Sequence, residues 1–170
     1  MEWAIDFPQE EFLIARPCLR RACLGNHIAG LFLSYLLYQA SISKEFRNYT
    51  KLYKQQYGCA NEDVPGFDGD ITIYKTQQEI IQGMNDEFSD RTLRDTAIPL
   101  LIALGYIDID TSDKTNSYTI HMPQIQTGIN NPPKREDVLP KLYDLIKDRN
   151  AFRKHRRLFR EKGNDCSMEQ

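Results

Sequence analysis

The sequence lacks any apolar run long enough to cross a membrane. Its longest apolar stretch, residues 28–40, is shorter than the roughly 20 residues that a transmembrane helix needs and is interrupted by Gly30 and Gln39. The first residues, Met1–Asp6, carry acids where a secretory signal peptide needs basic residues. We therefore expect a cytoplasmic protein that makes no membrane contact.

Cysteine is scarce and is not arranged for a metal or for a disulfide framework. The chain has 4 cysteines and 3 histidines, and their spacing fits no zinc signature. A chain of 170 residues is large enough to fold without disulfide staples. We therefore expect free thiols and no bound metal.

Motifs that mark common enzyme classes are absent as well. The sequence has no Gly-rich phosphate loop, no nucleophile elbow and no paired metal-ligand motif. The acids at 68–70 and 108–110 are far apart along the chain, and scattered acids rarely converge on an ion such as Mg²⁺. The sequence predicts a protein that is not an enzyme, with no catalytic residues, no cofactor and no small-molecule substrate.

Charges of both signs are present, but they are segregated along the chain. The formal net charge is −2, yet residues 16–54 hold 7 basic residues and 1 acid, and residues 134–162 hold 11 basic residues and 5 acids. Residues 71–123 hold 4 basic residues and 8 acids. A total near zero therefore hides two basic regions that could meet a polyanion such as DNA.

Two helices are predicted in the first basic region. The first runs from about Asn26, a good N-cap, to about Ala40, and its apolar residues occur all the way round, as in a central, buried helix. The second, Ser43–Tyr57, has an aromatic face, expected to pack on the core, and a basic face made of Lys44, Arg47, Lys51 and Lys54. The basic face is either only solvated or also in contact with phosphates.

The segment after residue 70 carries the most information. A short strand at 71–74 precedes Thr76-Gln77-Gln78-Glu79, a capping box that opens a short helix ending near Asn85. Ser89 caps a second helix with an apolar stripe at 3.6-residue spacing, which Gly105 ends. Alternation over 106–121 predicts a β-hairpin with one buried face. Then follow a predicted linker at 124–133, a basic C-terminal helix at 134–162 and a frayed tail at 163–170.

This order of helix, strand, two helices and hairpin is that of a winged helix-turn-helix, whose second paired helix enters the major groove. The residues that carry the likeness are Leu36-Leu37-Tyr38, Ile73-Tyr74-Lys75-Thr76, Ser89-Asp90-Arg91-Thr92-Leu93-Arg94, Leu104-Gly105-Tyr106-Ile107 and Asn116-Ser117-Tyr118. Over about residues 26–122 the sequence resembles the winged-helix domains of phage and plasmid replication proteins. Replisome organisers and the N-terminal domains of DnaD-like primosome proteins are the types that it resembles.

The resemblance implies a mainly helical α+β fold. Residues 1–123 would form a winged-helix domain with a helical insertion at 43–57. The recognition helix would carry Ser89, Arg91, Thr92 and Arg94, and the wing would carry Lys114. Lys75, within one of the matching stretches, is a further candidate for DNA contact.

Three features depart from the family pattern. Pro99 lies inside the predicted recognition helix, where it removes a hydrogen bond and should kink or split the helix at a cost of about 3 kcal/mol. The stretch between the first helix and Ile71 is a long insertion without an assigned role. The acidity of residues 71–123 opposes phosphate binding by the winged helix alone.

Two functions are compatible with these features. In the first, the chain binds double-stranded DNA in replication initiation or its control, or in transcription control, for a phage, plasmid or integrated element. Phosphate contacts would come from the basic face of 43–57 and from the C-terminal residues Arg153, Lys154, Arg156 and Arg157. In the second, an acidic winged helix binds itself, as a homo-oligomer, or a replication protein, and the aromatic helix from Phe46 to Tyr57 lies in an interface. Arg91 and Arg94 would then be surface charges paired with Asp90 and Asp95, Lys114 a turn residue, and the basic C-terminal stretch a solvated tail.

Overall fold

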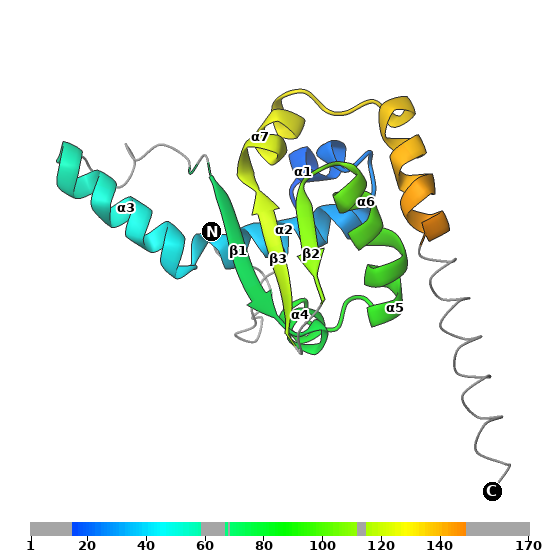
Figure 1. Cartoon of the computed structure of the whole chain (residues 1–170), viewed down its shortest axis with the longest axis horizontal. Helices are drawn as coiled ribbons and strands as arrows, with labels where there is room; N and C mark the ends of the chain where they lie inside the picture. The colour runs from blue at the N-terminus through cyan, green and yellow to red at the C-terminus, as the bar shows by residue number, and fades with distance from the viewer. Residues whose placement is uncertain (1–14, 59–66, 68, 112–114, 149–170) are drawn as a thin grey trace, which may run out of the picture.

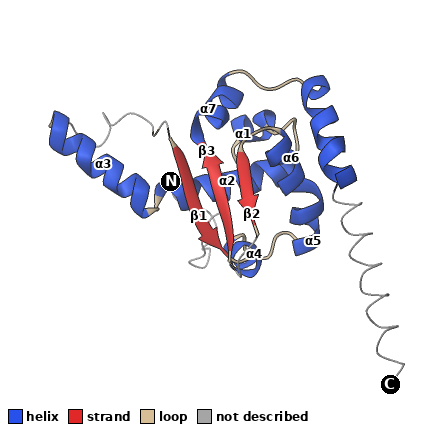
Figure 2. Ribbon diagram, in the orientation of Figure 1, coloured by secondary structure: helices blue, strands red, loops and turns tan. Residues whose placement is uncertain are grey.

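The computed structural model describes residues 15–58, 67, 69–111 and 115–148, which form a mainly helical α+β fold around a three-stranded antiparallel sheet (Figures 1 and 2). The helical elements are α1 (Pro17–Ala22), α2 (His27–Ser41), α3 (Lys44–Tyr57), α4 (Gln77–Gly83), α5 (Asp90–Thr92), the π-helical turn η2 (Leu93–Ala97), α6 (Ile98–Ala103) and α7 (Met122–Asn130). A further helix spans 135–148. The strands are β1 (Asp70–Lys75), β2 (Ile107–Asp110) and β3 (Asn116–His121).

The sheet has the order β1-β3-β2, so the last strand of the hairpin pairs back to the first strand. Tyr118 at the centre of β3 lies opposite Ile73 of β1 and Ile109 of β2. Side chains alternate between the two faces, and the inner face buries Ile71, Ile73, Ile107, Tyr118 and Ile120. The predicted strand at 71–74 and the predicted hairpin are both confirmed.

Helix α2 lies at the centre of the core, as its all-round apolar sequence predicts. Asn26 caps it, because its side-chain oxygen accepts a hydrogen bond from the Ala29 N–H at 2.9 Å. Eight of its residues are buried, namely Ala29, Gly30, Leu31, Phe32, Leu33, Tyr35, Leu36 and Ala40. The core continues into the hairpin and the second helix of the pair, where Leu93, Leu100, Leu101, Ile107 and Tyr118 are all buried together, as predicted.

The capping box at the start of α4 is confirmed. The Glu79 N–H donates to Thr76 Oγ1 at 3.2 Å, and Glu79 Oε2 accepts from the Thr76 N–H at 2.7 Å. These bonds satisfy two backbone donors that the start of a helix otherwise leaves without partners. A helix therefore begins directly after β1.

Of the two effects predicted for Pro99, a kink or a split, the split does not occur in the helix that follows Ser89. The backbone stays helical from 90 to 103, but its hydrogen bonding changes ahead of the proline. The Ile98 N–H bonds to the Leu93 carbonyl five residues back, which makes a π-helical turn. This wider turn takes up the proline ring without ending the helix.

The predicted linker at 124–133 is wrong for most of its length, because α7 occupies residues through Asn130. Pro123 lies in the first turn, where a helix needs no N–H from it. Gly128 is buried, and a Cβ atom there would overlap Tyr106 Oη. Pro123 therefore starts a helix, and Gly128 allows that helix to lie close to Tyr106. Helix α1 was not predicted at all.

The aromatic face of α3 packs against the core at Phe46, near the start of the helix, but not along its whole length as predicted. No residue of α3 is buried, and Figure 1 shows the helix projecting away from the sheet. Its rings contact each other in series, with centroid separations of 6.3 Å for Phe46 and Tyr49, 6.1 Å for Tyr49 and Tyr53, and 4.6 Å for Tyr53 and Tyr57. Phe67 lies against the first part of this aromatic ladder, 5.1 Å from Tyr49.

The C-terminal helix is confirmed over 135–148, where Val138 is buried and Leu142 and Leu145 pack against the core. The rest of the predicted helix, including Arg153, Lys154, Arg156 and Arg157, lies outside the described residues, as does the predicted tail at 163–170.

Candidate nucleic-acid interface

A tight turn joins α4 to the helix that follows it. Asn85 and Asp86 adopt the left-handed backbone conformation, with φ of 55° and 54°. Asn and Asp adopt this conformation more readily than most other residues. This turn leads to the start of α5 in the lower part of the molecule, on the same side as the end of the hairpin at which β2 leads into β3 (Figure 1).

Ser89 and Thr92 lie at the exposed start of α5, where the sequence places them. Ser89 Oγ accepts a hydrogen bond from the Thr92 N–H at 3.2 Å, and the two hydroxyls are 2.8 Å apart. Their observed role is to cap the helix. The cap fixes the direction in which the following arginines leave the backbone.

Arg91 and Arg94 are paired with acids of their own helix. Arg91 Nε lies 3.5 Å from Asp95 Oδ2, and Arg94 Nη1 lies 3.4 Å from Asp90 Oδ2. The side chains remain accessible, with exposed fractions of 86% for Arg91 and 46% for Arg94. Ion pairs this exposed contribute about 0–1 kcal/mol each, so a phosphate can replace the carboxylate at small cost.

Lys75 ends β1 opposite Asn116 of β3 and is half-buried, so it lies on a different element from Arg91 and Arg94. The Thr76 backbone N–H and hydroxyl donate to Glu79 and lower the pKa of that carboxyl, with a smaller contribution from Lys75. Lys114, the predicted wing residue, lies outside the described residues.

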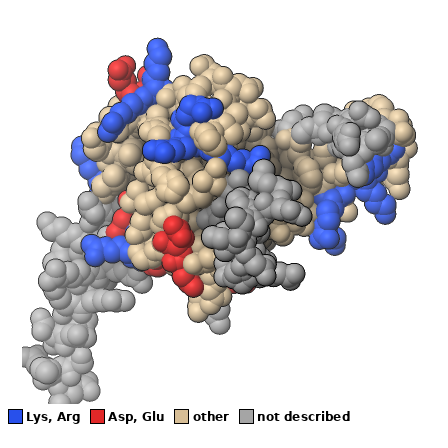
Figure 3. All heavy atoms as spheres, turned by 180° about the vertical axis from the view of Figure 1, so that it is seen from behind, with Lys and Arg blue, Asp and Glu red and all other residues tan. Residues whose placement is uncertain are grey.

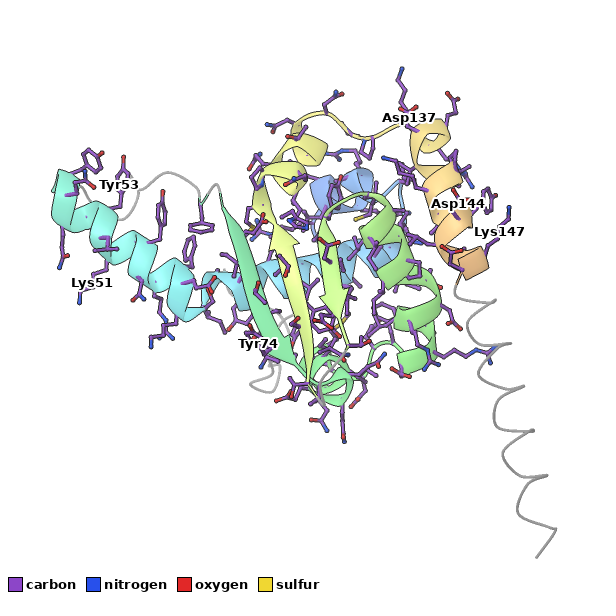
Figure 4. All side chains as sticks on the ribbon, in the orientation of Figure 1. Lys51, Tyr53, Tyr74, Asp137, Asp144 and Lys147 are labelled. Atoms are coloured by element: carbon purple, nitrogen blue, oxygen red, sulfur yellow. The ribbon has the colours of Figure 1, made fainter. Side chains whose placement is uncertain are left out.

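The basic residues of α3 lie away from its aromatic ladder. A hollow of about 450 Å³ runs along this side, lined by Ser41, Phe46, Thr50, Gln55 and the cations Arg47, Lys51 and Lys54. Lys44 is exposed at the start of the helix. Figure 4 shows Lys51 and Tyr53 on opposite sides of α3, so one helix offers a basic face and an aromatic face separately.

A cleft of about 330 Å³ lies where α6, the hairpin and helix 135–148 meet. Ile98 and Ile102 line it from α6, Tyr118 from β3 and Leu145 from the C-terminal helix, while Arg94 lies at its polar side. Burial raises the pKa of the Tyr118 hydroxyl. The sequence analysis did not predict this cleft, although the apolar spacing of Leu142 and Leu145 could have indicated that helix 135–148 returns to the domain.

Acidic residues mark the outer face of the sheet. His121 bridges the strands, with Nδ1 3.0 Å from Asp70 Oδ1 and Nε2 2.9 Å from Asp108 Oδ2. Because the carboxylates bind opposite nitrogens of one ring, the three side chains do not converge on a single ion. No group of three metal-ligating residues occurs within the described part of the chain.

The predicted site residues therefore fall into separate groups. Ser89, Arg91, Thr92 and Arg94 lie together on α5 and η2, while the cations of α3 lie on the other side of the molecule (Figure 1). Comparison with family models, curated proteins and solved structures gives no match to this chain. Among the described helices, none is long and apolar enough to cross a membrane.

Proposed function

We propose that this chain binds double-stranded DNA through a winged helix-turn-helix domain, in replication initiation or its control for a phage, plasmid or integrated element. One observation supports it above the others. The hairpin strand β3 pairs back to β1, and the end of the hairpin at which β2 leads into β3 lies in the same lower part of the molecule as the exposed start of α5 (Figure 1). A helix start and a hairpin presented together are what a winged helix places against a major groove and the adjacent backbone.

The recognition residues in this proposal are Arg91 and Arg94. Their ion pairs with Asp95 and Asp90 keep both guanidinium groups at the surface of the helix. A guanine presents two acceptors to an arginine in the major groove, and a good bidentate contact contributes about 1–3 kcal/mol of discrimination. On binding, each arginine exchanges a carboxylate for a base edge or a phosphate.

The test is a pair of variants with opposite expected effects. Fluorescence anisotropy with a pool of random duplexes at low salt would compare the wild type with Arg91→Ala/Arg94→Ala and with Asp95→Asn. The arginine variant should bind more weakly, and Asp95→Asn more tightly, because it frees the arginine that Asp95 holds. Equal binding by all three proteins would contradict the proposal, provided that their melting temperatures agree.

A second candidate function, self-association, is favoured by the aromatic ladder of α3. Tyr57 of that ladder and the neighbouring Leu52 are 61% and 64% exposed. A 14-residue helix that buries no side chain gains little from tertiary packing, and isolated helices of this length are marginal in water. Sedimentation across a concentration series should then show an oligomer that Tyr53→Ser/Tyr57→Ser dissociates and that Lys51→Gln/Lys54→Gln does not. A wild-type monomer at every concentration would exclude this function.

A further inference from the structure

The exposed cations of α1 form a second basic surface, separate from α5 and α3. Arg16, Arg20 and Arg21 are exposed on α1 and its N-cap, and Lys134 and Arg135 are exposed just after α7, which packs against α1. These five residues are called the α1 face below. Figure 3 shows the molecule from behind, where Lys and Arg gather over the upper half and on α3, and most acids lie in the lower half.

The three arginines of α1 and its N-cap lie in a stretch of sequence without acids. Residues 12–44 contain no Asp or Glu, whereas the exposed acids Glu136 and Asp137 directly follow Arg135. The ion pairs found among the described residues join carboxylates to Arg91, Arg94 and His121, and none reaches the α1 face. Its charge is therefore available to an anion without the exchange that Arg91 and Arg94 need.

The backbone that carries these cations is held firmly. Leu19 and Ala22 of α1 are buried, and the Arg20 Nε–H donates to the Gly25 carbonyl at 3.0 Å. Helix α1 also lies close to α2, since a Cβ atom at Gly30 would come within 3.2 Å of the Arg20 Cα. The α1 face is thus a surface of fixed shape, although its side chains extend into solvent.

The α1 face and the recognition segment lie in different parts of the molecule. Figure 1 shows α1 in the upper half behind the sheet, whereas α5 and the end of the hairpin at which β2 leads into β3 lie in the lower half. Helices α1 and α6 both pack on α2, whose width of about 10 Å adds to this separation. A straight duplex seated on α5 and the hairpin does not reach the α1 face.

The chemistry of the α1 face suits a nucleic-acid backbone better than a protein. The large hydrophobic residues that are exposed in the described part of the chain lie elsewhere, so the face has no apolar or aromatic anchor of the kind that dominates protein interfaces. A phosphate backbone needs cations and polar donors alone. Helix α7 adds exposed amides at Gln124, Gln126 and Asn130.

We propose that the α1 face holds the backbone of a second DNA duplex, so that one protein molecule bridges two duplexes. The inference rests on the proposed function, in which the first duplex is bound at α5. Contacts at the α1 face are to phosphates and are independent of sequence. The protein would therefore bind one site by recognition and hold any second duplex by charge.

The test is a capture assay with two variants of the full chain. One variant is Arg16→Gln/Arg21→Gln/Lys134→Gln/Arg135→Gln, which leaves Arg20 in place because it bonds to the Gly25 carbonyl. The control, Lys141→Gln/Lys147→Gln, removes two exposed cations of helix 135–148 that belong to neither proposed DNA contact. A duplex fixed to beads is saturated with protein, and capture of a second, labelled duplex is measured against salt. Binding of one duplex is measured separately by anisotropy, and folding by thermal melting.

The wild type and the control variant should capture the second duplex, while the α1-face variant should bind one duplex but lose the capture. The salt dependence of the capture should also fall, by about 0.9 in log–log slope for each phosphate contact removed. Capture that survives in the α1-face variant would overturn the inference, because self-association or the cations of α3 would then account for the behaviour. Single-duplex binding without capture by the wild type would overturn this inference alone. Absence of any duplex binding would overturn the proposed function as well.

Discussion

The hydroxyl of Tyr106 donates a hydrogen bond to the backbone carbonyl of Ala22 at 3.0 Å, joining residues 84 positions apart. Tyr106 begins the hairpin and Ala22 ends α1, so this bond connects the element that carries the α1 face to the sheet. Burial raises the pKa of Tyr106 to about 12, so the hydroxyl keeps its proton at any pH at which the protein would be studied.

Tyr106→Phe should lower the free energy of unfolding by about 1–2 kcal/mol, because it removes one partner of a buried hydrogen bond and leaves the Ala22 carbonyl without it. Urea denaturation would measure the change. Tyr74→Phe is the matched control, since Tyr74 is 70% exposed on β1 and should have no measurable effect. Equal stabilities of the two variants would show that the Tyr106 bond contributes nothing.

Gly128→Ala should destabilise the protein by about 1–3 kcal/mol through overpacking, although alanine is the better helix former. The added Cβ would overlap Tyr106 Oη. Because Tyr106→Phe removes that atom, the double variant should be more stable than the sum of the two single effects predicts. Gln126→Ala, at an exposed position of the same helix, controls for helix propensity. If the two changes in free energy of unfolding are strictly additive in the double variant, overlap with Tyr106 Oη is not the cause of the destabilisation by Gly128→Ala.

The bridge of His121 to Asp70 and Asp108 predicts a pH dependence of stability. Burial lowers the pKa of His121, but the hydrogen bonds to Asp108 and Asp70 outweigh it, so the pKa lies above its usual value of 6.5. A raised folded-state pKa means that the contribution is complete below about pH 6.5 and is lost as the pH rises through the folded-state value. His121→Gln should therefore lower the melting temperature at pH 6 more than at pH 9. A deficit that is independent of pH would show that His121 is not charged in the folded protein.

The sequence predicts best those features that depend on neighbours within a few residues. Asn26, Thr76 and Ser89 each cap a helix as their spacing indicates. The alternation of apolar and polar residues in the hairpin predicts which side chains of β3 are buried, because every second side chain of a strand points to the same face. Fold class and helix starts therefore follow from local rules.

The errors arise where a distant contact decides the outcome. The periodicity of α3 correctly gives a helix with two faces, but it does not say whether a core lies within reach of the aromatic one. A glycine such as Gly128 is typical of a linker, and nothing near it in the sequence shows that it lies against the ring of Tyr106, 22 positions earlier. Pro99 does not end the helix, because the turn that precedes it widens into a π-helical turn. The same holds for the candidate site. The pairing of Arg91 with Asp95 and of Arg94 with Asp90 follows from their four-residue spacing. The α1 face combines residues far apart in the sequence, and no local pattern predicts it.

The last prediction concerns the C-terminal cations, whose side chains lie beyond the described residues. Leu145 and Arg94 line the same cleft, so helix 135–148 brings the chain to the side of the molecule that carries α5 (Figure 1). In the proposed function, the basic residues that follow 148 then contact phosphates beside the recognition segment. Arg153→Gln/Lys154→Gln/Arg156→Gln/Arg157→Gln should weaken duplex binding, and each lost phosphate contact should reduce the slope of log affinity against log salt by about 0.9.

Lys141→Gln/Lys147→Gln provides the control, because both lysines are exposed on helix 135–148 itself and their loss tests the effect of net charge alone. Figure 4 shows Lys147 on the outer side of that helix. The C-terminal variant should keep the wild-type melting temperature, since the apolar contacts of Val138 and Leu142 are untouched. An unchanged salt slope would mean that these cations stay solvated when DNA binds, and affinity would then depend on α5 and α3. If both variants reduce the salt slope equally, DNA affinity depends on the net charge of the protein and not on the position of the C-terminal cations.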